Sequence, residues 1–154
     1  MFKYSLLRNA EIIVVCHYGK YVGAEADEAM LSILGKLTLA ERRQLKYVIQ
    51  DFFAVEEMSL HDTDVARRMG FFRKLSKLYQ TQNLEETLAS IGIYQILPER
   101  NDILAILNER GRKLGDYNAA KINLLPRTSL AETLLEIGEG KVPSEKDWLG
   151  PSDT

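Results

Sequence analysis

The sequence predicts an α/β fold, in which a single-layer, mixed and mostly parallel sheet of four to five strands is flanked by helices. The main observation is that an apolar extended segment alternates with a helical segment three times between Leu45 and about Gly138. A pair of short extended segments precedes that series. The resulting order, β-β-α-β-α-β-α-β-α, builds parallel strands joined by right-handed crossovers. The polar loops after these strands should therefore meet at one edge of the sheet.

The first two elements are expected to form an antiparallel hairpin. Phe2–Leu7 and Glu11–Tyr18 are β-type runs with only a short connection between them, which would leave the first strand at a sheet edge. From Gly23 the apolar residues recur every three or four positions, which predicts an amphipathic helix that Gly35 ends or frays. Thr38–Glu41 has the form of a capping box and can start one further helical turn.

Lys46–Phe53 is predicted to be a central strand, since its aromatic and β-branched residues are too dense for a strand with one solvated face. The helix after it has a broad apolar face and an opposite basic face. Its apolar face holds Val65, Met69, Phe72, Ser76 and Tyr79, widened by Phe71, Leu75 and Leu78, and its basic face holds Arg67, Arg73, Lys74 and Lys77. A basic face of this kind is typical of solvated surface.

The next strand is predicted at Leu88–Leu97, and Pro98 ends it because proline cannot donate a hydrogen bond to a sheet. Asn101 is expected to cap the helix that follows. Lys121–Leu125 is predicted to be the last short strand. These elements complete the alternation of strand and helix.

Ser129 predicts a capping box at the start of the last helix, because a glutamate follows it three residues later. The chain is expected to form a single domain over residues 1–140. Residues 141–154 are expected to form a polar tail, in which only Trp148 and Leu149 could dock on the domain.

The composition limits the classes of partner. With 20 basic and 22 acidic side chains the formal charge is -2, so we predict no nucleic-acid partner. No apolar run approaches the roughly 18 residues that span a bilayer, and the first residues lack a signal-peptide pattern. The only cysteine, Cys16, lies in an apolar run and is typical of a buried residue in a reducing compartment. We therefore expect a soluble cytoplasmic protein without a membrane span.

No cofactor or metal site is predicted. His17 follows Cys16 directly, but adjacent strand residues point to opposite faces and cannot readily hold one ion. The glycine-rich patterns that bind dinucleotides or nucleotide phosphates do not occur. His17 is therefore expected to have a structural or surface role.

The segment Glu56–Asp64 is the most polar stretch after a predicted strand, and it has two interpretations. It could hold His61 as a general base beside an aspartate, with Ser59 or Thr63 as the nucleophile. It could instead be a helix start that Asp62 or Thr63 caps. The spacing favours capping, because residues one or two positions apart cannot form a catalytic triad by themselves.

The order of elements and the segment 51–60 resemble the STAS fold of anti-sigma-factor antagonists and sulfate-transporter tails. The chain looks most like a bacterial single-domain branch described as STAS-like, and it is also similar to CRAL-TRIO lipid-transfer domains. The positions that match the antagonists' motif are Asp51, Val55 and Met58. Ser59 and Leu60 depart from it, since they replace the motif's last aspartate and its phosphorylated serine.

The resemblance implies a non-catalytic regulatory module that binds a protein partner, such as a regulatory kinase or an anti-sigma-like factor. The expected contact is the loop at residues 56–64 and the helix after it, through Ser59, His61, Thr63, Arg67, Phe71 and Leu78. Phe71 and Leu78 are the candidates for a homodimer or partner contact, although a deeper core or the docked tail could cover them equally well. Ser59 or Thr63 could replace the missing phosphorylated serine, because a phosphate near a helix N-terminus is stabilised there.

Two alternatives remain open. The chain could carry a lipid or another small apolar ligand in a pocket lined by Phe52, Phe53, Phe72 and Tyr79. Aromatic residues at such positions are more often part of a core. The second alternative is an enzyme that uses His61 with a nearby acid, which would require a concave site.

Overall fold

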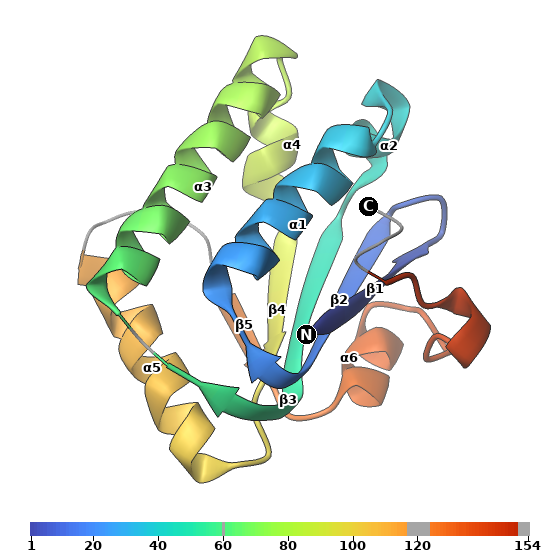
Figure 1. The fold of residues 1–154 in the computed structure, drawn as a ribbon. Coiled ribbons are helices and arrows are strands. Elements are labelled where there is room, and N and C mark those ends of the chain that lie inside the picture. The colour runs from blue at the N-terminus through green and yellow to red at the C-terminus, as the bar shows by residue number, and fades with distance from the viewer. Residues whose placement is uncertain (60, 117–123, 151–154) are drawn as a thin grey trace.

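The computed structural model describes residues 1–59, 61–116 and 124–150. Within these residues one sheet of five strands has the spatial order β1-β2-β3-β4-β5 (Figure 1). The strands are β1 (Phe2–Leu7), β2 (Ile12–Tyr21), β3 (Tyr47–Met58), β4 (Gly92–Ile96) and β5 (Leu124–Arg127). The pair β1 and β2 is antiparallel, and the other neighbours are parallel. The predicted α/β class and the position of β1 at the sheet edge are confirmed.

The helices lie on both faces of the sheet (Figure 1). They are α1 (Gly23–Lys36), α2 (Leu39–Gln44), α3 (Asp62–Thr81), α4 (Glu85–Ser90), α5 (Asn101–Asp116) and α6 (Leu130–Glu136). A short 3-10 turn follows at Glu145–Asp147. None of the helices in the described ranges is both long and apolar enough to cross a membrane.

The core has two sides because successive residues of β2 point to opposite faces of the sheet. Ile13 and Val15 pack against α1 and α3, in a cluster that includes Phe71. Ile12 and Val14 pack on the other face with Leu134 of α6. This double burial explains why β2 and the first half of β3 are nearly continuous apolar runs.

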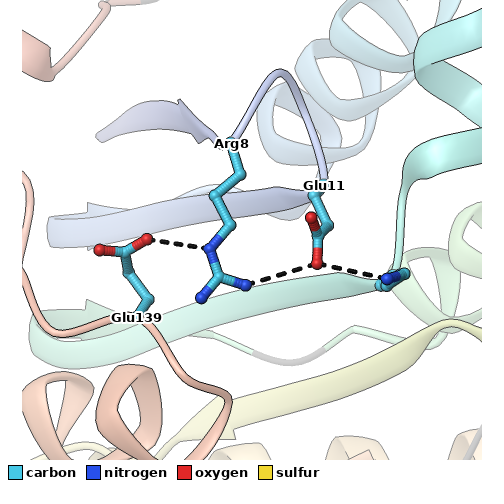
Figure 2. A network of polar contacts seen from close by, with 4 residues as sticks. Arg8, Glu11 and Glu139 are labelled. Atoms are coloured by element: carbon cyan, nitrogen blue, oxygen red, sulfur yellow. Dashed lines mark hydrogen bonds and ion pairs between the residues drawn. The ribbon is translucent and has the colours of Figure 1, made fainter.

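The turn between β1 and β2 is tight and is held by ion pairs. Residues 8–10 have positive φ angles of 52°, 54° and 67°. Arg8 lies 3.1 Å from Glu139 and 3.4 Å from Glu11, and Lys46 lies 3.5 Å from the same Glu11 oxygen (Figure 2). The network ties the turn to the segment after α6 and to the start of β3.

The segment after α6 returns to the edge of the sheet. Leu149 forms a two-way backbone bridge with Tyr4 of β1, with N···O distances of 2.8 and 2.9 Å. The Trp148 ring packs beside the core cluster of α6, and the Lys3 ammonium lies 4.8 Å from its centroid. The predicted docking of these two residues is confirmed, and residues 151–154 of the predicted tail lie outside the described residues.

Two helix starts agree with the sequence, whereas the start of α5 differs. Thr38 and Glu41 form the predicted capping box, with hydrogen bonds of 3.1 and 2.9 Å. Ser129 accepts a hydrogen bond from the Glu132 N–H at 3.3 Å, which caps α6. Helix α5 includes Asn101, so the predicted cap at that residue is wrong. The residue before it, Arg100, provides the carbonyl that accepts from Leu104 at 3.0 Å.

The boundaries of four strands differ from the prediction. β2 continues to Tyr21 instead of ending at Tyr18. β3 continues to Met58 instead of ending at Phe53, because Val55 and Met58 are also buried. The segment predicted as strand from Leu88 begins instead with the end of helix α4, and β4 starts only at Gly92. The last strand runs through Pro126 to Arg127, while residues 121–123 of its predicted span lie outside the described residues.

Candidate functional site

The ends of β2 and β3 meet the starts of α1 and α3 at one edge of the sheet, and α5 passes alongside them (Figure 1). A small cavity of about 10 Å³ lies at this junction. It is lined by Tyr21, Gly23, Asp27, Met58, Ser59, Asp64 and Arg110. Its volume is close to that of one water-sized sphere. The predicted convergence of loops at this edge is therefore present, and it encloses a charged cavity.

An ion pair between α1 and α3 forms one wall of the cavity. The Asp27 carboxylate accepts a hydrogen bond from Nη1 of Arg68, and the two side chains are only 5% and 16% exposed. The Arg68 guanidinium also lies over the rings of Phe71 and Phe72, at 4.7 and 5.2 Å from their centroids. Burial lowers the pKa of Arg68, and the nearby charge of Arg110 lowers it further.

Arg110 reaches the cavity from α5 and is 7% exposed. Its guanidinium carbon lies 5.3 Å from the centroid of the Tyr21 ring. Among the described residues its guanidinium makes no hydrogen bond and no ion pair. A second cationic side chain is therefore buried close to Arg68, and the carboxylate of Asp27 is already paired with Arg68.

His17 lies in β2 with its ring 5.0 Å from that of Tyr21, which lines the cavity, and it is 2% exposed. Its Nε2 is 2.6 Å from Oε1 of Gln50, and its ring stacks on Phe52 with centroids 4.7 Å apart. Burial lowers the pKa of His17 to about 3, and the charges of Arg110 and Arg68 act in the same direction. The structural role predicted for His17 agrees with this environment.

Of the predicted contact residues, Ser59 lines the cavity, and His61, Thr63 and Arg67 follow it at the start of α3. Ser59, His61 and Thr63 are exposed, and Arg67 is partly buried. The Asp64 carboxylate accepts from Arg67 at 2.8 Å and from the His61 N–H at 3.0 Å. Although burial raises the pKa of Asp64, these hydrogen bonds lower it below the ordinary value. We call Ser59, His61, Thr63 and Arg67 the α3 rim.

The cap of α3 corrects the sequence prediction. His61 is the N-cap residue, in place of Asp62 or Thr63, and it has an extended backbone conformation. The acid that closes the first turn is Asp64, which reaches back to the His61 N–H. The same carboxylate binds Arg67, so it is not committed to orienting the His61 imidazole. Leu60, which replaces the phosphorylated serine of the STAS motif, lies outside the described residues.

Two predicted contact residues of α3 lie away from the rim. Phe71 is 6% exposed and packs in the core cluster with Met30 and Ile33 of α1. Leu78 is partly buried. Phe71 therefore cannot contact a partner in this conformation, because α1 already covers it.

The four aromatic residues predicted to line a ligand pocket are not brought together. Phe52 is 3% exposed and packs with Tyr21, whereas Phe53 points to the opposite face of the sheet and is 46% exposed. Tyr79 is completely buried and Phe72 is partly buried. Phe52 and Phe53 cannot line one cavity, because the sheet lies between their side chains.

Comparison of the chain with known protein families, with curated proteins and with solved structures found no match. The resemblance to STAS-like domains therefore stays a prediction. No relative assigns a role to any residue at this edge of the sheet. What the cavity and the α3 rim can do must follow from their own geometry and charge.

The sequence prediction missed the charged residues of the cavity, although each leaves a signal in its helix. Arg110 follows Ile103 and Leu107 at spacings of four and three, so it continues the apolar face of α5. Asp27 and Arg68 likewise lie three or four positions before apolar residues that are buried in α1 and α3. A charged residue within the apolar face of a helix predicts a buried ion pair or a functional site. Its partner cannot be identified from spacing, because it lies on another element.

Proposed function

We propose that this chain is a non-catalytic regulatory module that binds a protein partner through the α3 rim. The observation that carries this proposal is a cluster of exposed residues at the start of α3: Ser59 lines the cavity, and His61 and Thr63 follow it in the chain. This cluster follows the carboxyl end of β3, and α/β proteins commonly bind ligands beyond the carboxyl ends of their parallel strands.

Hydrogen bonds within the first turns of α3 hold part of the rim. Asp64 links the His61 N–H to the Arg67 guanidinium with hydrogen bonds of 3.0 and 2.8 Å. A surface that is already ordered loses less conformational entropy on binding. This arrangement supports recognition of a partner by a preformed surface.

The same contacts favour binding over catalysis by His61. A general base needs a group that orients its imidazole, as the aspartate does in a Ser-His-Asp triad. Here the Asp64 carboxylate is occupied by Arg67 and by the backbone of His61. Ser59 and Thr63 are exposed hydroxyl residues that flank the helix start, so they remain the proposed sites of phosphorylation.

The proposed partner is a regulatory kinase or an anti-sigma-like factor, as the resemblance to STAS-like domains implies. A cytoplasmic location belongs to the same proposal and agrees with the free thiol of Cys16. A homodimer is a further form of partner, and of its two predicted contact residues only Leu78 is not in the core, since α1 covers Phe71.

Site-specific photo-crosslinking tests the proposal. A photoreactive residue replaces Thr63 at the rim, and in the control it replaces Glu132, which is exposed on α6 at the other face of the sheet. We expect a discrete adduct from the Thr63 position in an extract of cells that express the chain, and excess unmodified chain should prevent it. No adduct at Thr63, or equal adducts at both positions, would contradict the proposal.

A further inference from the structure

The charges that line the cavity beside the α3 rim are unbalanced. Its two acidic residues each have a partner, since Asp27 pairs with Arg68 and Asp64 pairs with Arg67. Arg110 lines the same cavity and has no such partner among the described residues. The cavity and its immediate wall therefore carry one uncompensated positive charge.

This charge is buried. Arg110 is 7% exposed, and an arginine remains protonated in proteins. A buried cation without an anion is costly, so buried charges are normally paired. The ring of Tyr21 provides a cation–π contact at 5.3 Å, but a ring face supplies neither a negative charge nor a hydrogen-bond acceptor in the plane of the guanidinium.

The start of α1 adds a second source of positive potential. Gly23 is the first residue of this 14-residue helix and lines the cavity. Its N-cap residue is Val22, whose side chain has no oxygen to accept from the first amides. Free N–H groups and the helix dipole favour an anion at such an end.

The size of the cavity restricts the anion. A volume of about 10 Å³ accommodates roughly one water-sized atom, so one oxygen of a ligand can enter while the rest stays outside. A singly charged carboxylate also matches the single excess charge. A phosphate dianion carries more charge and more volume than the site offers.

We propose that the Arg110 cavity binds one carboxylate of the protein partner, from an Asp or Glu side chain. One carboxylate oxygen accepts from the Arg110 guanidinium, and the amide at the start of α1 lies beside it. This inference rests on the proposed function for the source of the carboxylate. It predicts that the partner presents an acidic segment to the α3 rim.

Acetate is a suitable probe, because it carries the carboxylate without the partner. The full chain, labelled with ¹⁵N, is titrated with sodium acetate at constant ionic strength against sodium chloride, and the Gly23 amide and the Arg110 Nε–H are followed by NMR. We expect a saturable shift of both signals with acetate. A linear response equal to that of chloride would overturn the proposal, and so would tighter binding of inorganic phosphate.

Variants assign the response to the cavity. Arg110→Met should weaken acetate binding at least tenfold, whereas Arg112→Met, at an exposed position of the same helix, should leave it unchanged. Gly23→Ala keeps every charge, and its methyl group would lie 3.7 Å from Arg67 Nη1, an ordinary contact distance. Gly23→Ala should weaken acetate binding, while the amide signals of the other residues keep their chemical shifts. Unchanged binding in both Arg110→Met and Gly23→Ala would overturn the proposal.

The two proposals can fail separately. A Thr63 adduct together with no saturable acetate binding would overturn the carboxylate cavity and retain the protein partner. Saturable acetate binding that depends on Arg110, without a Thr63 adduct, would retain the chemistry of the cavity and overturn the protein partner as its ligand.

Discussion

His17 of β2 and Gln50 of β3 are hydrogen-bonded side chain to side chain inside the protein, with Nε2 2.6 Å from Oε1. An amide oxygen only accepts, so the imidazole donates from Nε2. Burial and the nearby guanidinium groups of Arg110 and Arg68 hold the pKa of His17 at about 3, below the ordinary value of 6.5. The folded protein therefore keeps this histidine neutral.

The first prediction follows from this pKa. As the pH falls below about 6.5, the unfolded state binds the proton at His17 while the folded state does not, until about pH 3. The contribution of His17 to the free energy of unfolding is therefore complete above pH 6.5. It decreases by about 1.4 kcal/mol for each pH unit below that value. Urea unfolding from pH 7 to pH 4 measures it. In the double variant His17→Phe, Gln50→Leu, the free energy of unfolding should depend less steeply on pH, by this amount. An equal dependence on pH in both proteins would contradict a buried, neutral His17.

The second prediction concerns the ion pair of Asp27 and Arg68. Asp27→Asn should lower the free energy of unfolding by about 3–5 kcal/mol, because it leaves a buried guanidinium without its carboxylate. Asp102→Asn is the control, since its pair with Arg100 is well exposed and should contribute little. Chemical denaturation measures both variants. A loss at Asp27 no larger than that at Asp102 would show that the pair is not buried in solution.

The third prediction compares two glycines. Gly138 has a φ of +86°, so Gly138→Ala should cost about 1–2 kcal/mol of stability. Gly111 lies in α5 with open space around it, so Gly111→Ala should add up to about 1 kcal/mol. The midpoint temperatures of thermal unfolding of the two variants should therefore shift in opposite directions. Shifts of the same sign would contradict the backbone conformation at one of the two sites.

The fourth prediction concerns the docking of Leu149 on β1. Leu149→Pro removes the N–H that donates to the Tyr4 carbonyl at 2.8 Å, whereas Leu149→Ala keeps it. The only tryptophan, Trp148, lies next to this bridge, so its fluorescence reports the contact. Acrylamide should quench Trp148 more strongly in Leu149→Pro than in Leu149→Ala. Equal quenching would mean that the backbone bridge does not hold this segment.

Local patterns were sufficient to predict most of the fold. The apolar periodicity of α1 and α3, and the capping residues Thr38 and Ser129, act within a few positions of the chain, so the sequence shows them directly. The extension of β3 to Met58 was missed because beyond Phe52 only every third residue, Val55 and Met58, is buried. A regular strand alternates with a period of two, and irregularities in the pairing with β2 break that period here.

The candidate site could be predicted only in part. Ser59, His61 and Thr63 follow a strand, and the rule that loops converge at the carboxyl edge places them correctly. The cavity depends on Asp27, Arg68 and Arg110, which come from α1, α3 and α5. Their proximity is set by how three helices pack on the sheet, and no spacing along the chain encodes that relation.

The order of the strands in space repeats their order along the chain. Each new strand can therefore pair with the edge strand of the sheet formed so far. No strand has to insert between two strands that are already paired. Assembly can proceed by successive addition, in which a tight turn joins β1 to β2 and a helical connection joins each later pair of strands. Loop-closure entropy grows with the length of the connection, so this topology favours folding that advances from one end of the chain to the other.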